Sequence, residues 1–279
     1  MGDIINGKAH AKNIHEEVKA RLATIEGTPH LAVVLVGDNP ASKVYIEMKQ
    51  KACEEVGINF SLHTLPQEAT QREVLTTIDR LNASSQVTGI LVQQPLPPHI
   101  DKHNCVSKIH PSKDVDCLHP YNVGLLIAGK GNVLPGTPAG IINLLDRENI
   151  SLEGKHVVIV GRSDIVGKPL AFMALERNAT VTVCHSFTQN LAEICSTADI
   201  LVVAIGKAGF ITSKYVKEGA VVIDVGVNRL ESGKVVGDVD FETVLDKVSY
   251  ITPVPKGVGP MTVATLLENC LRAWELNHE

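Results

Sequence analysis

Short apolar runs recur along the second half of the chain, with stretches of helical spacing between them. Four of these runs are predicted strands, namely His156 to Val160, Val181 to Cys184, Ile200 to Ile205 and Val221 to Val225. Because the runs are apolar throughout rather than alternating, they are typical of a parallel sheet that is covered on both faces. The pattern predicts an α/β fold with a doubly wound parallel sheet in this half.

The first half repeats the pattern on a smaller scale. Leu31 to Val36 and Gly89 to Val92 are predicted strands, and residues 70–82 have helical spacing. Near the end of the chain, Met261 to Leu276 also carries apolar residues at helical spacing. We expect this last, amphipathic helix to pack back on the first domain.

The best position for a domain junction lies between the two halves. Lys130 to Gly140 is rich in glycine and proline, and a short apolar helix is expected over Ile141 to Arg147. With 279 residues, the chain exceeds the usual size of a single hydrophobic core. We therefore predict two α/β domains, one formed by residues 1–138 and 263–279 and the other by residues 139–262.

Composition and charge exclude several classes of partner and site. The net charge of -5 gives no electrostatic reason to bind nucleic acid or an anionic membrane, so a small molecule is the expected partner. The first residues lack a basic region followed by an apolar stretch, and no apolar run is long enough to span a bilayer. The six cysteines form no C-x-x-C pair. We expect free thiols, no metal site and a cytoplasmic protein.

A glycine-containing turn follows the first strand of the second half. The strand ending at Val160 runs into Gly161, Ser163 and Gly167 before a helix, whose N-terminus offers free N–H groups to a pyrophosphate. The spacing is G-x-S-x-x-x-G rather than G-x-G-x-x-G. The segment is therefore either a dinucleotide-binding turn, with the Ser163 hydroxyl in place of a second glycine, or a plain strand–turn–helix.

The end of the next strand favours NADP over NAD. NAD-binding versions place Asp or Glu about 20 residues further on, to hold the ribose 2′-hydroxyl, whereas this strand ends in Cys184, His185 and Ser186. No acid is present there to repel a 2′-phosphate, and Arg162, His185 and Ser186 are available to bind one. Arg162 is otherwise a solvated loop charge. Loops after the two following strands, Val227 among them, are expected to line the cofactor.

One lysine lies on the apolar side of a predicted helix. The residues around Pro40 supply an N-cap and a first-turn proline for a helix from about Ala41 to Val56, and Lys49 is the lone charge on its apolar face. Either Lys49 extends to solvent, or its amine is partly desolvated, which lowers its pKa and allows proton transfer near neutral pH. Tyr45, one turn away, supplies a ring on which a flat heterocycle could stack.

Further polar positions follow the strand Gly89 to Val92. Gln93 stands at its carboxyl end, where prolines stop the strand. Asp114 and Asp116, if that segment is extended, share one face, and one of them could accept hydrogen bonds from a ring amino group. A solvated acidic turn explains the two aspartates equally well.

Several ordered motifs resemble those of the bifunctional methylenetetrahydrofolate dehydrogenase/methenyltetrahydrofolate cyclohydrolase (FolD) family, and the resemblance runs over essentially the whole chain. The matching segments are Val36-Gly37-Asp38-Asn39-Pro40-Ala41-Ser42 with Tyr45-x-x-x-Lys49, Val92-Gln93-x-Pro95-Leu96-Pro97, Lys113-Asp114-Val115-Asp116, Gly161-Arg162-Ser163-x-x-Val166-Gly167 and Gly257-Val258-Gly259-Pro260-Met261-Thr262. The resemblance implies a folate-binding catalytic domain (1–138 and 263–279) and a Rossmann-like NADP-binding domain (139–262) that flank a cleft. It also implies a homodimer.

Residue roles follow from the same resemblance. Lys49 would be the principal catalytic residue, with Gln93 holding its amine, while Asp116 hydrogen-bonds the pterin ring and Tyr45 stacks on the folate. The expected substrate-binding residues are Tyr45, Lys49, Val92, Gln93, Gln94, Asp116, Pro255, Gly257 and Gly259. The expected NADP-binding residues are Gly161, Arg162, Ser163, His185, Ser186 and Val227.

The implied activity is NADP-dependent oxidation of 5,10-methylenetetrahydrofolate to the methenyl compound, followed by hydrolysis to 10-formyltetrahydrofolate. One pocket can serve both steps, because a neutral Lys49 tolerates the cation left by hydride loss and then moves protons during water addition. Two alternatives stay open. One is a monofunctional NAD(P) dehydrogenase with Lys49 and Asp116 as an acid/base pair, and the other is a catalytically silent folate or nucleotide sensor.

The sequence departs from the family pattern at four positions. Gln94 stands where Leu is common, Cys117 where Gly follows the aspartate, Gly136 where Cys precedes Thr-Pro, and Lys256 where Gly opens the Gly-Val-Gly turn. A glycine at position 256 suits a positive φ, which a lysine adopts only at a cost. The lysine also adds a charge near the expected folate or nicotinamide site, so it is the departure that bears most on the balance of the two activities.

Overall fold

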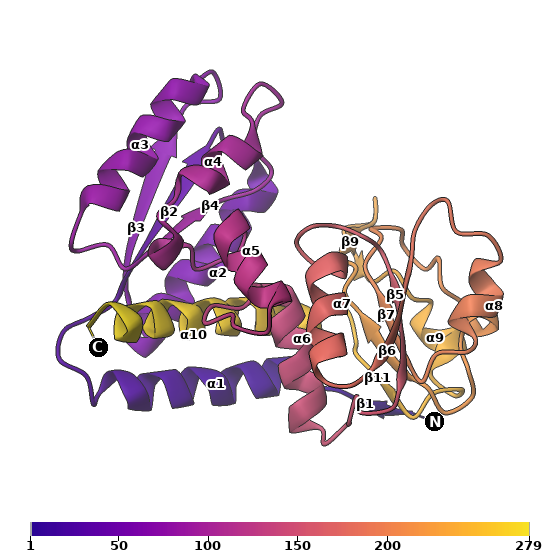
Figure 1. Ribbon diagram of the computed structural model, residues 1–279. Helices are drawn as coiled ribbons and strands as arrows, with labels where there is room; N and C mark the ends of the chain where they lie inside the picture. Colours follow the sequence, from indigo (N-terminus) through magenta and orange to yellow (C-terminus); the bar gives the residue numbers. More distant parts are fainter. Residues whose placement is uncertain (1, 279) are drawn as a thin grey trace. The chain divides into compact units, whose positions relative to one another are not determined.

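The computed structural model describes residues 2–278, which divide into two compact units (Figure 1). The six-stranded unit comprises residues 2–11 and Pro135–Thr262, and the three-stranded unit comprises Lys12–Leu134 and residues 263–278. From the sequence we placed residues 1–11 with the first domain. In the structure β1 (Asp3–Ile4) pairs in parallel with β11 (Tyr250–Ile251), which draws residues 2–11 into the six-stranded unit. A two-residue strand has too little pattern to be recognised in a sequence.

All strands of the larger sheet run parallel, in the order β1-β11-β8-β7-β5-β6. The four predicted strands are present as β5 (His156–Val160), β6 (Thr180–Cys184), β7 (Ile200–Val203) and β8 (Val221–Asp224). The helices of this unit are α6 (Gly136–Arg147), α7 (Gly167–Glu176), α8 (Leu191–Cys195) and α9 (Phe241–Val244). α8 and α9 join one buried cluster with the sheet, whereas α7 packs on β5 and β6 outside that cluster. The predicted doubly wound parallel sheet is confirmed.

The order of strands reverses at β5, because β6 lies on one side of it and β7 on the other. In such sheets ligands bind beyond the carboxyl ends of the strands at the reversal. The loops that follow β5 and β7 meet there, where the amide of Ala204 donates to the carbonyl of Val160 at 2.8 Å. This edge is therefore the place in the unit where a bound ligand is expected.

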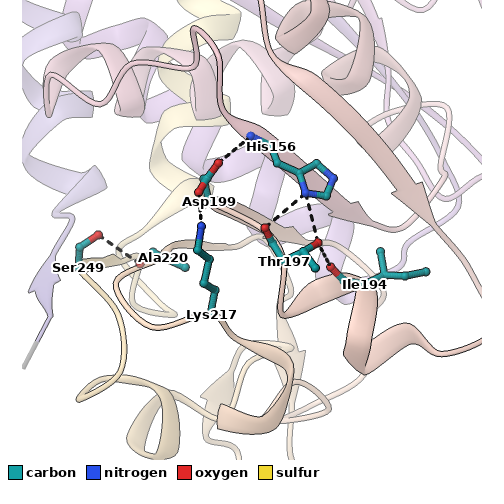
Figure 2. A network of polar contacts seen from close by, with 7 residues as sticks. All are labelled: His156, Ile194, Thr197, Asp199, Lys217, Ala220 and Ser249. Carbon is teal, nitrogen blue, oxygen red and sulfur yellow. Dashed lines mark hydrogen bonds and ion pairs between the residues drawn. The ribbon is translucent and has the colours of Figure 1, made fainter.

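Side chains hold the opposite, amino edge of the same sheet together (Figure 2). The Asp199 carboxylate, just before β7, accepts hydrogen bonds from the backbone amide of His156 (2.9 Å) and the ammonium of Lys217 (2.6 Å). The Lys217 hydrogen bond, followed by the His156 amide, lowers the pKa of Asp199. Since His156 opens β5 and Lys217 precedes β8, this carboxylate aligns three neighbouring strands from their amino ends.

The smaller sheet is also parallel, in the order β3-β2-β4. Its strands are β2 (His30–Val36), β3 (Asn59–Leu65) and β4 (Gly89–Val92), and the helices of this part of the chain are α1 (Gly7–Leu22), α2 (Pro40–Val56), α3 (Gln71–Ala83), α4 (Lys102–Lys108), α5 (Pro120–Ile127) and α10 (Val258–His278). One buried cluster joins β2 and β4 to α3 and α4. α2 connects β2 to β3 and places its buried face, which includes Cys53 and Val56, inside the unit.

The junction segment differs from the sequence prediction. α6 begins at Gly136, whereas the sequence predicted a helix only from Ile141, so half of the Gly/Pro-rich stretch is helical. Pro138 lies in the first turn, where backbone N–H groups have no intrahelical partner and a proline is tolerated. Gly140 is required by packing, because a Cβ there would lie 2.9 Å from the Cβ of Met261.

Residues 2–278 contain neither a candidate membrane-spanning helix nor a candidate metal site. No helix in this range is long and apolar enough to cross a membrane. No group of three or more His, Cys, Asp or Glu side chains within it is arranged to hold a metal ion. The six cysteines are buried free thiols.

Candidate active site

Lys49 lies on α2 with its amine directed at the end of β4. Its Nζ donates a 2.8 Å hydrogen bond to Oε1 of Gln93, and the Gln93 side-chain amide donates to the Gln94 carbonyl at 2.6 Å. Gln93 is buried and Lys49 is half-buried. The amine is thus held by a neighbouring side chain rather than extending freely into solvent.

The first turn of α2 is tied to the same segment. Asn39 caps the helix by accepting hydrogen bonds from the amides of Ala41 (2.9 Å) and Ser42 (3.3 Å), as the sequence predicted. The buried Ser42 hydroxyl donates to the Gln94 carbonyl at 3.3 Å. This contact uses only the backbone of Gln94, which a leucine would also offer. Replacement of the family's Leu by Gln therefore leaves the contact intact.

The ionisation of Lys49 is coupled to that of Asp116. Burial lowers the pKa of Lys49, and the Asp116 carboxylate opposes this shift. Burial raises the pKa of Asp116, and Lys49 opposes that shift in turn. Loss of water thus favours the neutral form of each group, while each favours the charged form of the other. The pKa of Lys49 is lowered on balance, so the neutral amine forms more readily than in a fully solvated lysine.

The two aspartates after β4 differ in their surroundings. Asp114 is 1% exposed and accepts hydrogen bonds at 2.8 to 3.2 Å from two backbone amides and the Asn122 side chain. The segment is not extended, because residues 115–116 form a turn and Cys117 follows with a φ of 56°. Asp114 therefore anchors the loop before α5, and Asp116 is the carboxylate that acts on Lys49.

The other candidate substrate residues fall in two groups. In the three-stranded unit, Tyr45 is 42% exposed on α2 one turn before Lys49, and Val92 is the buried last residue of β4. Pro255, Gly257 and Gly259 belong to the six-stranded unit, where they lie on the turn that leads into α10 and in its first residues.

Two of the four departures from the family pattern occupy left-handed backbone positions. Lys256 has a φ of 85° and Cys117 a φ of 56°, as suits the glycines they replace. The exposed Lys256 keeps its place because its carbonyl accepts a 3.0 Å hydrogen bond from the amide of Lys8. A non-glycine residue in this region costs about 1–2 kcal/mol. The backbone at these two positions therefore carries strain.

The turn after β5 has the close backbone packing of a phosphate-binding turn. Gly161 has a φ of 130°, and a Cβ there would lie 2.3 Å from the carbonyl oxygen of Ala204. A Cβ at Gly167, where α7 begins, would lie 2.0 Å from the carbonyl oxygen of Gly161. The Ser163 hydroxyl accepts a 3.2 Å hydrogen bond from the Val166 amide, which leaves its hydrogen to donate. Glycines at both ends and the N-terminus of α7 fit a dinucleotide.

Two of the predicted 2′-phosphate residues, Arg162 and His185, lie against the exposed ring of Phe187. Phe187 is 78% exposed, the Arg162 guanidinium lies 5.7 Å from its ring centroid, and the His185 ring packs edge-on against it at 6.1 Å. Ser186 is exposed between His185 and Phe187. Phe187 was not among the predicted residues, although a phenylalanine in an otherwise polar loop at a strand end is a usable signal. Val227, after β8, is 54% exposed.

Two buried aspartates at this edge were also not predicted from the sequence to be functional residues. Asp224, the last residue of β8, is 4% exposed, and Asp238 is fully buried. An acidic residue at the end of an apolar strand was a signal for Asp224. Nothing local distinguishes Asp238 from the neighbouring Asp240 in the sequence.

Two family models match this chain. The tetrahydrofolate dehydrogenase/cyclohydrolase catalytic domain matches residues 5–116, and the NAD(P)-binding domain of the same enzymes matches residues 135–278. The chain is 52% identical over 278 residues to the bifunctional protein FolD of Agathobacter rectalis, covering 98% of this chain and 99% of that protein.

Solved structures agree with the family models. The bifunctional FolD methylenetetrahydrofolate dehydrogenase/cyclohydrolase of Campylobacter jejuni has a TM-score of 0.96 at 50% identity, with 99% of this chain and 100% of that chain covered. The Trypanosoma brucei methylenetetrahydrofolate dehydrogenase-cyclohydrolase, solved with NADP cofactor and inhibitor, has a TM-score of 0.96 at 38% identity, with 100% and 99% covered.

Proposed function

The chain belongs to the tetrahydrofolate dehydrogenase/cyclohydrolase family, and we propose that Lys49, held by Gln93, carries both of the family's reactions in it. The enzyme oxidises 5,10-methylenetetrahydrofolate with NADP and hydrolyses the methenyl product to 10-formyltetrahydrofolate. The observation that carries this proposal is the 2.8 Å contact between the Lys49 amine and Gln93, in surroundings that lower the pKa of Lys49.

The dehydrogenase step needs a site that tolerates positive charge on the substrate. The methylene carbon loses a hydride, for which NADP, when bound, supplies the acceptor. Positive charge develops between the two flanking nitrogens, and a neutral Lys49 avoids the repulsion that an ammonium would add. Asp116 accepts hydrogen bonds from the pterin ring and Tyr45 stacks on the folate, which holds the reacting carbon near Lys49.

The cyclohydrolase step uses the same amine as a base. Water adds to the methenyl carbon as Lys49 removes one of its protons. The second water proton then moves from the new hydroxyl to a ring nitrogen as the bond between that nitrogen and the carbon breaks, which gives the formyl product. The side-chain oxygen of Gln93 accepts a hydrogen bond from one N–H of the Lys49 amine. This contact restricts the rotation of the amine and so directs its lone pair.

The six-stranded unit holds the nucleotide in this proposal. Gly161, Ser163 and the N-terminus of α7 bind the pyrophosphate, supported by the two glycine positions that a Cβ would fill. Arg162, His185 and Ser186 bind the 2′-phosphate, supported by the gathering of Arg162 and His185 on one ring. Val227 lines the cofactor from the loop after β8. Pro255, Gly257 and Gly259 contact the folate.

We extend the proposal to a cytoplasmic homodimer that supplies one-carbon units for purine, methionine and histidine biosynthesis. Family membership is its support. Light scattering coupled to size-exclusion chromatography measures the mass in solution, and a mass of about 30 kDa rather than twice that value would contradict the dimer.

Replacing Lys49 by methionine tests the proposed site. Lys49→Met keeps the length of the side chain and removes the amine, so we expect kcat of both reactions to fall by about 10²- to 10⁴-fold. NADPH formation and the loss of methenyl absorbance measure the two steps separately. Lys43→Met, on the exposed face of the same helix, is the control and should retain both rates.

The same assays separate the alternatives. Parent-level turnover by Lys49→Met in either reaction would remove this mechanism. NADPH formation without hydrolysis by the unmodified protein would indicate a monofunctional dehydrogenase, and binding without either reaction would indicate a silent sensor.

A further inference from the structure

A buried acidic pair lies beneath the carboxyl edge of the six-stranded sheet, outside all residues assigned a role above. Asp224 ends β8, and Asp238 follows the antiparallel hairpin of β9 (Asn228–Arg229) and β10 (Val235–Val236). Carboxylates that have lost water require hydrogen-bond donors from the protein. The identity of those donors indicates what each aspartate holds in place.

Asp238 collects donors from two different loops. Oδ2 accepts from the amides of Ile205 (2.7 Å) and Gly206 (2.9 Å), and Oδ1 accepts from the amide of Lys207 (2.7 Å) and from Nδ2 of Asn228 (2.9 Å). Three consecutive amides of the loop after β7 therefore converge on one carboxylate. The fourth donor comes from the segment after β8, so a single side chain fixes both loops to each other.

Asp224 holds the Asp238 segment from below. Its Oδ1 accepts from the amides of Gly226 (3.0 Å) and Asp238 (2.9 Å), and its Oδ2 accepts from the amide of Val239 (2.9 Å). The fit is close, because a Cβ at Gly226 would lie 2.2 Å from Oδ1 of Asp238 and one at Gly237 would lie 1.8 Å from Oδ2 of Asp224. Neither glycine could carry a side chain without displacing one of the two carboxylates.

Apolar burial contributes little to the loops that Asp238 holds, although the amide of Gly209 also donates to the carbonyl of Gly237 at 3.1 Å and the Phe210 ring lies 5.8 Å from that of Tyr215. Residues 206–210 are exposed, and so is Val227. These loops are therefore ordered mainly by polar contacts, and the Asp238 carboxylate accepts four of the hydrogen bonds. Loops at the carboxyl edge of such sheets are the ones that contact a bound nucleotide.

We propose that Asp238 is a positioning residue for NADP, which fixes the loops after β7 and β8 in the shape that the cofactor requires. The proposal rests on the NADP-dependent activity proposed above and adds a residue that acts without touching the cofactor. An asparagine at position 238 replaces one acceptor oxygen by an N–H₂ group that faces N–H donors, so two of the four hydrogen bonds are lost and the loops are released.

Direct binding of NADP⁺, measured by titration calorimetry, tests this role. Asp238→Asn is expected to weaken binding by about 10- to 100-fold, because hydrogen bonds to a charged group are lost. Cyclohydrolase turnover measured without nucleotide should stay within about twofold of the parent, since loss of a local carboxylate contact leaves the other unit folded. Asp240→Asn is the matched control, because the Asp240 side chain makes no capping hydrogen bond to α9.

A milder variant keeps the test decisive if Asp238→Asn does not fold. Asn228→Ala removes only one of the four donors, so we expect NADP⁺ binding to weaken by about threefold to tenfold. Parent-level NADP⁺ affinity in either folded variant, or a parallel loss of cyclohydrolase activity, would overturn the proposal. Failure of the unmodified protein to bind NADP⁺ would be seen first and would remove the proposed function itself.

Discussion

The carboxyl edges of the two sheets are built in opposite ways. At the end of β4, the chemistry resides in side chains, because the Lys49 amine is held by Gln93 and coupled to Asp116. At the ends of β5, β7 and β8, the surface is backbone shaped by glycines, and the carboxylates of Asp224 and Asp238 lie buried beneath it.

The difference follows from the two tasks. Proton transfer needs a titratable group with a shifted pKa, which only a side chain supplies. Binding of a pyrophosphate needs N–H groups and close approach of the chain, which a side chain at Gly161 or Gly167 would prevent. If this division is real, substitutions at one edge should affect one activity or ligand and spare the other.

The largest effect is expected from adding a side chain to the glycine-containing turn after β5. A Cβ at Gly167 would lie 2.0 Å from the Gly161 carbonyl oxygen, so Gly167→Ala must displace the turn. We expect NADP⁺ affinity to fall by about 100-fold, with nucleotide-free hydrolysis of methenyltetrahydrofolate retained. Calorimetry and the loss of methenyl absorbance measure the two effects.

The control for this substitution lies in the other unit. Gly124, within α5, has no neighbour within 4 Å of an added Cβ. Gly124→Ala should leave both activities unchanged and stabilise the protein by about 0.5–1 kcal/mol, as Ala does for Gly in a helix. Equal loss of both activities in Gly167→Ala would show that the two edges are not separable.

The two edges also differ in how far the sequence predicts them. The six predicted strands, the cap of α2 and the placement of Lys49 on its apolar face were recognisable because each depends on local spacing, whereas β3 was not predicted. Asp238 was not, because its role depends on amides of residues 205–207, about 30 positions away, which converge only after the sheet has formed. Asp114 and Asp116 were equal candidates in the sequence, and only the fold shows that the Asp114 carboxylate accepts hydrogen bonds from the loop before α5 and from Asn122.

Removing the charge of Asp116 tests how that carboxylate controls the ionisation of Lys49. Asp116 raises the pKa of Lys49 against the effect of burial, so Asp116→Asn should lower that pKa further. The amine then stays neutral to lower pH, and the acidic limb of the kcat profile for hydrolysis should move to lower pH. KM for the folate should rise by about tenfold, because a hydrogen bond to a charged group is lost.

Asp114→Asn is the informative contrast for this experiment. Asp114 is buried and bonded to backbone amides and Asn122, so its replacement should lower the melting temperature rather than shift the pH profile. An acidic limb that stays in place in Asp116→Asn, or moves to higher pH, would contradict the coupling of Lys49 to Asp116.

The smallest expected effects concern Lys256 in the six-stranded unit and Cys117 in the three-stranded unit, which both have a positive φ. Lys256 is exposed and has a positive φ, so Lys256→Gly should stabilise the protein by about 0.5–1 kcal/mol, the relief of strain exceeding the added chain entropy. Cys117→Gly relieves the same kind of strain but removes a buried side chain, so it should give no net stabilisation. For Lys256→Gly the melting temperature, read by circular dichroism, should rise by about 2 °C. Lys256→Ala separates strain from charge, because it removes the ammonium and keeps the φ. If Lys256→Ala changes the ratio of dehydrogenase to cyclohydrolase activity, the charge of Lys256 governs that ratio. If Lys256→Gly has a higher melting temperature than Lys256→Ala, the positive φ governs the stability. Equal melting temperatures for the alanine and glycine variants would show that position 256 is not strained.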